Sequence, residues 1–320
     1  MIEVSNLTKD YGSRRAINDL SFKINKGEIV GFLGPNGAGK TTTMRILSGY
    51  MPPTSGKVEI GGYDIFDDSL KARQIIGYLP ETVPLYTDMT VFDYLKFMAD
   101  LRKVKNSDDR VDEVLEMIHL DDRSDSLISR LSKGMKQRVG IAQALIHKPE
   151  VLILDEPTIG LDPTQIIDVR NLIKEVGKEH TVLLSTHILS EAQHVCDRVL
   201  IINKGQIVAE DTPDKLQSNL KGSRRITVSI DGNIDDAIQT ISNTPGVTSV
   251  QKKTEQSAEF ETLQDSDSRS KVAKNIVNAG FELTELYSAN MSLEDIFLQL
   301  IQDDPNNGQG TASIKSNTEG

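Results

Sequence analysis

Cysteine is nearly absent from this sequence of 320 residues, which contains only Cys196. A single cysteine cannot form a disulfide bond within the chain, and it excludes a metal site built from several cysteines. The composition fits a reducing compartment. We expect Cys196 to be a small, buried hydrophobic residue.

Long hydrophobic runs are also lacking. The most apolar segments are residues 151–154, 181–185 and 199–202, far shorter than the roughly 20 residues that a membrane-spanning helix requires. Runs of this length are typical of buried parallel strands. The first residues show no basic segment followed by an apolar block, so no secretory signal is visible and we expect a cytoplasmic location.

The sequence has fewer positive than negative side chains, with 36 Lys and Arg residues and 47 Asp and Glu residues, which gives a formal net charge of -11. This balance opposes association with nucleic acid and with anionic lipid surfaces. We therefore expect no nucleic-acid partner. Any phosphate-bearing ligand must be captured locally by a dedicated site.

The chain is long enough for one large domain and a smaller one. From residue 2 to about residue 203, apolar β-branched runs alternate with helical patterns, which predicts an α/β fold with a doubly wound parallel sheet. Residues 2–7 and 17–24 are predicted to form antiparallel strands before this core. Strand patterns are missing between residues 82 and 131, so a helical subdomain, about residues 82–148, is predicted to be inserted there.

After residue 220 the pattern changes to that of a small ferredoxin-like α+β domain, predicted for residues 221–302. Its elements are expected in the order strand, helix, strand, strand, helix, strand, at residues 226–230, 234–241, 248–252, 259–263, 270–278 and 282–287. A last helix is predicted at 292–301. Residues 303–320 are too polar to fold and should form a disordered tail.

The strongest motif is a phosphate-binding loop with the sequence Gly34-Pro35-Asn36-Gly37-Ala38-Gly39-Lys40-Thr41. An apolar run precedes it and a helical pattern that begins with Thr42 follows it, as this motif requires. Its backbone N–H groups and Thr42 are expected to bind the phosphates of a nucleotide. Lys40 should bridge the β- and γ-phosphates, and Thr41 should ligate Mg²⁺. The alternative is an incidental glycine-rich turn.

Two adjacent carboxylates, Asp155 and Glu156, end the apolar run 151–154. The carboxyl end of such a strand would meet the phosphate loop, so Asp155 is expected to hold the Mg²⁺ shell and Glu156 to deprotonate the attacking water. The run 181–185 then leads to His187, a possible partner of the γ-phosphate. The alternatives are solvated turn carboxylates and a structural histidine.

A further motif gives these residues a family resemblance. The segment Leu131-Ser132-Lys133-Gly134-Met135-Lys136-Gln137-Arg138 resembles the signature motif of the ATP-binding subunits of ABC transporters. The resemblance covers about residues 1–220, and Ser132 is also a natural N-cap for the helix that follows.

This resemblance implies roles for further residues. Ser132 and Gly134 would reach the γ-phosphate held by an opposite subunit, and Tyr11 would stack on adenine. Asp162 belongs to a loop through which two subunits communicate, and His187 resembles the switch histidine.

The sequence also departs from the family pattern. Glu81 stands where most members have glutamine, and its carboxylate could still ligate Mg²⁺. In the signature, Lys133 replaces a glycine and Met135 replaces a glutamine. These features, together with residues 292–297, resemble the exporter-type branch, which includes subunits linked to gliding motility and drug resistance.

The chain has one phosphate loop and one signature motif, so a complete site requires a second ATP-binding subunit, most simply a second copy in a two-fold pair. The resemblance implies ATP and Mg²⁺ as cofactors, and a separate multi-span permease subunit that would hold the protein at the inner face of the cell membrane. Residues 82–100 would pass the motion to that permease.

Two other classes of protein share part of this pattern. Soluble ABC proteins of translation or DNA repair usually carry two cassettes or a long coiled coil, and neither is seen in this sequence. A small-molecule kinase would not explain the signature motif or His187.

Overall fold

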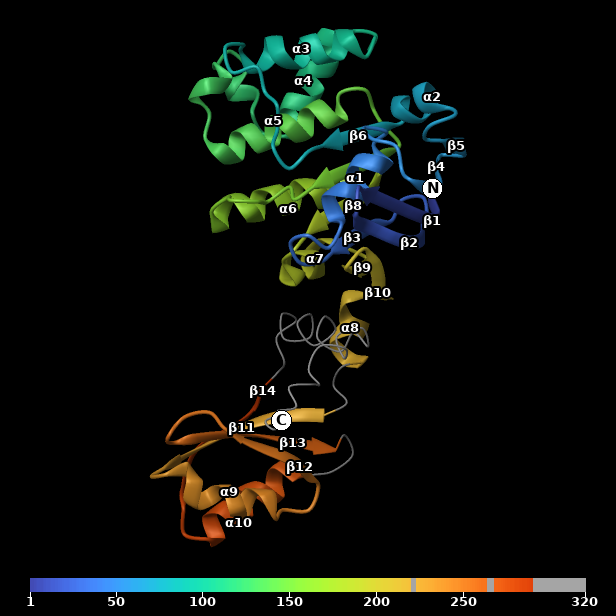
Figure 1. The fold of residues 1–320 in the computed structure, drawn as a ribbon. Helices are drawn as coiled ribbons and strands as arrows, with labels where there is room; N and C mark the ends of the chain where they lie inside the picture. Colours follow the sequence, from blue (N-terminus) through green and yellow to red (C-terminus); the bar gives the residue numbers. More distant parts are fainter. Residues whose placement is uncertain (220–222, 264–267, 290–320) are drawn as a thin grey trace, which may run out of the picture. The chain divides into compact units, whose positions relative to one another are not determined.

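The computed structural model describes residues 1–219, 223–263 and 268–289. The chain forms two compact units, Met1–Pro213 and Asp214–Gly320 (Figure 1). The first unit ends at Pro213, while the sequence patterns placed a domain boundary at residues 220–221. The predicted helix 292–301 and the predicted tail 303–320 lie outside the described residues.

The first unit opens with an antiparallel sheet of strand order β2-β1-β4-β5. These strands are β1 (Ile2–Tyr11), β2 (Arg14–Ile24), β4 (Ser55–Ile60) and β5 (Tyr63–Asp64). The turn between β1 and β2 contains Gly12, whose φ of 59° favours glycine. The predicted antiparallel pair at the start of the chain is therefore confirmed.

The second sheet of this unit has six strands in the order β10-β9-β3-β8-β7-β6. They are β3 (Ile29–Leu33), β6 (Ile76–Leu79), β7 (Val151–Asp155), β8 (Thr181–Thr186), β9 (Arg198–Asn203) and β10 (Gln206–Asp211). All neighbouring strands run parallel except β10, which is antiparallel to β9. Because β3, β8 and β7 are consecutive, their carboxyl ends share one edge of the sheet.

Helix α1 (Lys40–Leu47) packs between the two sheets. Its buried Met44, Ile46 and Leu47 join a core cluster that includes Val4 of β1 and Ile153 of β7. Three further helices belong to this part of the unit: α2 (Ser69–Gln74), α6 (Pro163–Gly177) and α7 (Leu189–Val195). The fixed position of α1 against β7 and β8 brings the end of the phosphate loop beside the ends of both strands.

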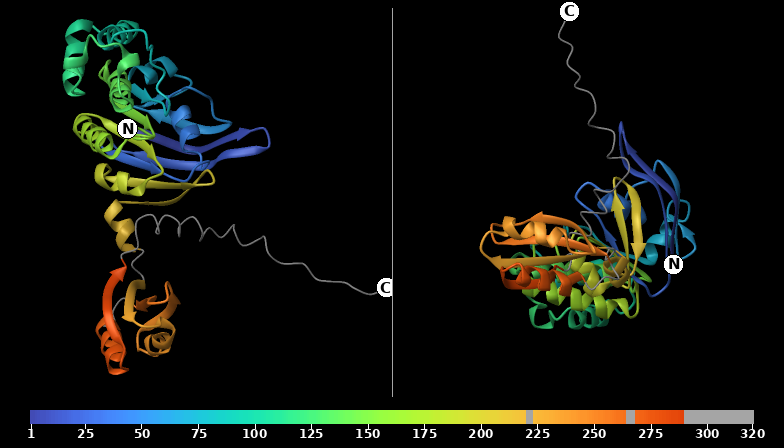
Figure 2. Two further views of the ribbon diagram at one scale, coloured as in Figure 1. Left: turned by 90° about the vertical axis from the view of Figure 1, so that its left-hand side faces the viewer. Right: turned by 90° about the horizontal axis from the view of Figure 1, so that it is seen from below.

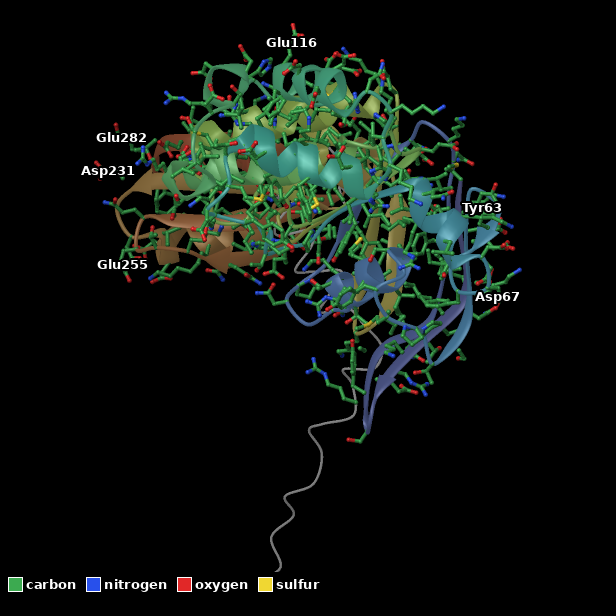
Figure 3. The ribbon with its side chains drawn as sticks, turned by 90° about the horizontal axis from the view of Figure 1, so that it is seen from above. Tyr63, Asp67, Glu116, Asp231, Glu255 and Glu282 are labelled. Carbon is green, nitrogen blue, oxygen red and sulfur yellow. The ribbon has the colours of Figure 1, made fainter. Side chains whose placement is uncertain are left out.

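A helical region is inserted between β6 and β7, as predicted. It contains α3 (Val91–Leu101), α4 (Ser107–Met117), α5 (Lys133–Leu145) and the short 3₁₀ turns η1 (Asp121–Arg123) and η2 (Ile128–Arg130). Figure 2 shows these helices grouped at one end of the first unit. The apolar faces of α3 and α4 are buried, while Glu116 on α4 is exposed and points outward (Figure 3).

The second unit contains a sheet of strand order β12-β13-β11-β14, with every neighbouring pair antiparallel. Its elements are α8 (Pro213–Asn219), β11 (Ser223–Asp231), α9 (Ile234–Ser242), β12 (Val247–Lys252), β13 (Ser257–Leu263), α10 (Ser268–Asn278) and β14 (Glu282–Ala289). From β11 onward the order of elements is the predicted one, and Phe260 lies in a separate core with residues of α9 and α10.

Within the described ranges, no helix combines the length and the apolar composition needed to span a membrane. Cys196 is buried, as expected from its residue type.

Candidate active site

The loop between β3 and α1 curls so tightly that two of its glycines have no room for a side chain. A Cβ atom at Gly34 would lie 2.5 Å from the carbonyl oxygen of Ile202, and one at Gly39 would lie 2.7 Å from that of Ala16. Gly39 also has a φ of 112°, which other residues rarely adopt. The glycines thus allow the backbone to form a concave loop at the start of α1, where free N–H groups favour an anion.

Lys40 places its ammonium group inside this loop. The side chain is 6% exposed, and its Nζ donates to the carbonyl oxygens of Gly34 at 2.8 Å and Pro35 at 3.3 Å. Nζ also lies 3.2 Å from Oε1 of Glu156. The phosphate loop and the carboxylate after β7 are therefore joined by one buried cation.

Asp155 lies at the end of β7 and accepts hydrogen bonds on Oδ1 from two hydroxyl groups. Ser185 donates at 2.6 Å and Thr41 at 3.4 Å. Burial raises the pKa of Asp155 above its ordinary value, although the two hydrogen bonds oppose the rise, and the negative charges of Glu81 and Glu156 add to it.

The other carboxylate oxygen of Asp155, Oδ2, is buried and has no hydrogen-bond partner among the described residues. This free oxygen and the nearby Thr41 hydroxyl are hard ligands of the kind that Mg²⁺ prefers. The donor set of these two side chains thus fits a magnesium ion. Glu81 and Thr41 line one cavity, and the Glu81 carboxylate could supply a further oxygen.

Glu156 is buried, with an exposed fraction of 5%, and its φ of 49° is unusual for a residue other than glycine. Its backbone N–H donates to Ser185 Oγ at 2.9 Å. One carboxylate oxygen pairs with Lys40, while Oε2 lies 2.8 Å from Nδ1 of His187. The geometry holds this carboxylate at the wall of a cavity, where it can accept a proton from a water molecule.

These groups line a cavity of about 770 Å³. Of the residues predicted from the sequence, the structure places the following ones around it: Tyr11, Asn36, Gly37, Gly39, Lys40, Thr41, Thr42, Glu81, Glu156 and His187. Tyr11 is 45% exposed. Its hydroxyl group donates to the sulfur atom of Met51 at 3.2 Å, and its ring stands at the rim, where a base could stack. Gly34, Pro35 and Ala38 belong to the phosphate loop but do not line the cavity.

Asp155 is fully buried and is not among the residues that line this cavity. Three further predicted residues, at the starts of α5 and α6, do not line it either. Ser132 caps α5 by accepting from Met135 N at 3.2 Å, and Asp162 caps α6 by accepting from Gln165 N at 2.9 Å. Gly134 lies directly against the side chain of Gln165, which a Cβ atom would approach to 2.7 Å. The starts of α5 and α6 are therefore packed together, apart from the lysine and the carboxylates of the same chain.

Several residues of the site were not predicted from the sequence. Arg14 and Arg45 add positive charge to the cavity, and Ala16 and Ile159 complete its wall. Ser185, on the neighbouring strand, donates to the Asp155 carboxylate and accepts from the backbone N–H of Glu156. A hydroxyl residue at the end of an apolar strand was the only available signal for Ser185.

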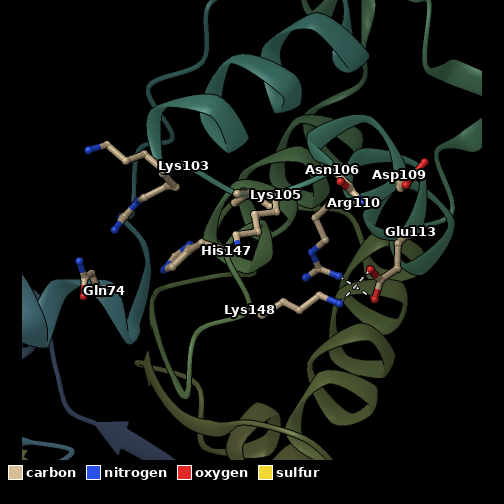
Figure 4. A pocket seen from close by; sticks show the side chains of 11 residues that line it. Gln74, Lys103, Lys105, Asn106, Asp109, Arg110, Glu113, His147 and Lys148 are labelled. Atoms are coloured by element: carbon tan, nitrogen blue, oxygen red, sulfur yellow. Dashed lines mark ion pairs between the residues drawn. The ribbon is translucent and has the colours of Figure 1, made fainter.

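A second cavity, of about 690 Å³, lies between the α3–α4 connection and the end of α5 (Figure 4). Arg110 and Lys148 both pair there with Glu113, at 2.8 and 3.2 Å. Burial, with help from the positive charges of Arg102 and Arg110, lowers the pKa of His147 to about 4. None of the residues predicted for the active site lines this cavity.

Comparison with known proteins gives consistent matches. The family model described as ABC transporter matches residues 17–159. The uncharacterized ABC transporter ATP-binding protein YxlF of Bacillus subtilis is 35% identical over 303 residues, which cover 94% of this chain and 99% of that protein. The bacitracin transport ATP-binding protein BcrA of Bacillus licheniformis is 42% identical over 68% of this chain and 71% of its own length.

Among solved structures, the chain is similar to the ATP-binding cassette MJ0796, a dimer in a post-hydrolysis state bound to ADP and Pi. That match has a TM-score of 0.61 and 26% identity, and it covers 67% of this chain and 99% of the other.

Proposed function

Because this chain belongs to the ATP-binding subunits of ABC transporters, which hydrolyse ATP to power transport, we propose that two copies of it close around ATP and that Glu156 is the general base. The observation that carries this proposal is the position of Glu156, buried between Lys40 and His187 at the edge of a nucleotide-sized cavity.

ATP enters with its phosphates in the concave loop. Its triphosphate takes the place of Glu156 as the partner of Lys40, and the backbone N–H groups at the start of α1 bind the phosphate oxygens. Thr41 and Asp155 would hold a Mg²⁺ ion, which would supply positive charge to neutralise the phosphates. Tyr11 stacks on the adenine base.

Hydrolysis then requires a water molecule in line with the γ-phosphate. Glu156 accepts a proton from this water as the oxygen attacks phosphorus, the bond to the β-phosphate oxygen breaks, and ADP leaves with the electron pair of that bond. His187 keeps Glu156 oriented through Nδ1 and reaches the γ-phosphate with its other ring nitrogen.

The complete site requires a second chain. Ser132, Gly134 and Asp162 do not line the cavity that holds Lys40, so a two-fold pair would let each copy present these residues to the nucleotide of the other. The dimeric structure of the related cassette MJ0796 supports this arrangement.

Phosphate release by Glu156→Gln tests the catalytic assignment. The amide keeps the size of the side chain but cannot accept the proton, so the rate should fall by about 10²–10⁴-fold. Glu175→Gln, an exposed change on α6, is the matched control and should keep the rate of the parent protein. If the Glu156 variant hydrolysed ATP at the parental rate, Glu156 would not be the general base.

Coupling to transport is proposed to run through residues 82–100 to a separate permease subunit at the inner face of the membrane. Tyr86 and Phe97 in this region are 53% and 41% exposed, which leaves apolar surface free for a partner. Related proteins are named for bacitracin transport and for drug resistance, which favours export over the alternative of translation or DNA repair.

Crosslinking can test this coupling surface cleanly, because the sequence contains one cysteine and it is buried. In a Cys196→Ala background, Phe97→Cys should crosslink to a membrane protein in native membranes. Glu116→Cys, on the outer face of α4, is the control and should not. Equal crosslinking at both positions would contradict the proposed surface.

A further inference from the structure

Glu191 is a buried carboxylate outside the nucleotide cavity. It lies in α7 and is 5% exposed. A buried carboxylate is costly unless neighbouring groups compensate its charge. Its Oε2 atom accepts hydrogen bonds from the hydroxyl groups of Thr158, at 2.6 Å, and Thr186, at 3.0 Å. One oxygen atom thus joins two segments that are distant in sequence.

The first of these segments carries Glu156. Thr158 follows this carboxylate by two residues, in a turn where Ile159 N donates to the carbonyl oxygen of Glu156 at 3.1 Å and Leu161 N donates to that of Thr158 at 3.2 Å. The hydrogen bond from Thr158 to Glu191 therefore anchors the turn that sets the direction of the Glu156 side chain.

The second segment carries His187. Thr186 immediately precedes it, and the hydroxyl of Thr186 also accepts from Ile188 N at 3.0 Å. The carbonyl oxygen of Thr186 accepts from Gly34 N at 3.3 Å. Because its proton is directed to Glu191, the Thr186 hydroxyl has a lone pair for Ile188, and both backbone neighbours of His187 are fixed.

A third contact links the same carboxylate to α6. Arg170 lies with NH2 3.6 Å from Glu191 Oε1, a distance that allows charge attraction but exceeds a hydrogen bond. The side chain of Arg170 is 21% exposed. Glu191 is thus linked to a third segment, helix α6, which begins after Asp162.

We propose that Glu191 is a positioning residue for ATP hydrolysis, which holds Glu156 and His187 at their 2.8 Å contact through the hydroxyl groups of Thr158 and Thr186. The inference rests on the proposed roles of Glu156 and His187. Glu191 itself does not line the nucleotide cavity. It acts because one of its side-chain oxygens accepts hydrogen bonds from both hydroxyls and so ties the two segments together.

Glu191→Ala tests this role because kcat and the affinity for ATP can be measured separately. Loss of the anchor should lower kcat by up to about 10²-fold, since small displacements of reacting groups are costly. The affinity for ATP should stay near that of the parent, because Lys40 and the phosphate loop are untouched. Glu191→Gln keeps an oxygen that can accept from both hydroxyls, and should retain most of the activity.

The possible outcomes distinguish a positioning role of Glu191 from a role in folding alone. A folded Glu191→Ala protein with parental kcat, or one whose ATP affinity falls as much as its kcat, would overturn the proposal. Inactivity of Glu191→Gln as complete as that of Glu156→Gln would also overturn it, since the charge rather than the hydrogen-bond geometry would then matter. Circular dichroism and nucleotide binding establish that each variant is folded.

A double-mutant cycle with Thr158→Val gives the decisive measurement. In the parent protein this change should lower kcat by about tenfold, and in the Glu191→Ala background it should have no further effect, because its partner is gone. Thr284→Val, an exposed change on β14 of the second unit, is the matched control and should keep the parental kcat. Independent, additive losses would refute action through Glu191. Parental activity of Glu156→Gln would instead refute the proposed role of Glu156 as general base. The two failures are distinguishable, because additive losses in the cycle refute only the role of Glu191.

Discussion

Lys40 is the residue on which nucleotide binding depends most strongly. It is buried, and its ammonium group lies inside the phosphate loop. Lys40→Ala removes a charge-assisted contact with the phosphates, so ATP should bind about 10- to 100-fold more weakly. Titration with a fluorescent ATP analogue measures this loss.

The control for this experiment is Lys174→Ala, which removes the same charge from an exposed position on α6. It should bind ATP as the parent does. Near-normal affinity in the Lys40 variant would contradict the assignment of the phosphate loop.

The ionised side chain of Asp155 should lower the stability of the nucleotide-free protein although hydrolysis requires it. Burial raises its pKa, which means that the folded protein favours the protonated form and that the ionised carboxylate destabilises the fold at neutral pH. This destabilisation is lost as the pH falls through the pKa. Asp155→Asn should therefore raise the melting temperature of the nucleotide-free protein at pH 7.5 by a few degrees, less so at acid pH, while it abolishes Mg²⁺-dependent hydrolysis.

Thermal unfolding at several pH values measures this effect, and Asp168→Asn, an exposed change on α6, is the control. A lower melting temperature for Asp155→Asn at pH 7.5 would show that its hydrogen bonds outweigh the cost of its burial.

Some residues of the site could be found from the sequence and others could not. Lys40, Asp155 and Glu156 stand in motifs whose spacing is local, so their proximity followed from the shared edge of a parallel sheet. Ser185 and Glu191 have no such local signal. Their contacts depend on which strands and helices become neighbours, and an isolated serine or glutamate is compatible with many surface positions.

At the scale of single elements, α3 begins with a well-formed cap. The hydroxyl of Thr90 accepts from Asp93 N at 3.1 Å. Thr90→Ala should destabilise the protein by about 1 kcal/mol, which corresponds to a fall of about 2–4 °C in melting temperature for a domain of this size. Calorimetry measures this change. Thr87→Ala, exposed just before the helix, should leave the melting temperature unchanged, and an equal effect at both positions would contradict the role of the cap.

Elements with strong periodicity were predictable. Helix α3 (Val91–Leu101) lies where the helical subdomain, about residues 82–148, was predicted, because its apolar positions repeat at helical spacing. Helix α8 and strand β10 were not foreseen. Strand β10 is an antiparallel edge strand with few buried residues, and helix α8 has only seven residues, so neither carries an apolar pattern that stands out from a loop.

At the scale of the whole molecule, the nucleotide cavity is built entirely from the first unit, and the second unit has its own core. Deletion of residues 222–320 should therefore leave ATP affinity within about a factor of two of the parent value. Isothermal titration with the folded truncated protein measures this. Complete loss of binding would show that the second unit is needed to form the site.

The division into two units was visible in the sequence as a change of pattern near residue 220. The need for a second copy was also inferred from the sequence, because the chain has one phosphate loop and one signature motif. The structure adds a physical reason, since α5 and α6 present Ser132 and Asp162 away from the cavity of their own chain.

The central claim, a composite site that closes on ATP and reopens on hydrolysis by Glu156, is tested most directly by size-exclusion chromatography of Glu156→Gln with ATP and Mg²⁺. The variant should elute as a dimer, because nucleotide binding survives while reopening is blocked, and addition of Ser132→Arg should return it to a monomer. A Glu156→Gln protein that stays monomeric with ATP bound, or a dimer that persists with Ser132→Arg, would contradict the account.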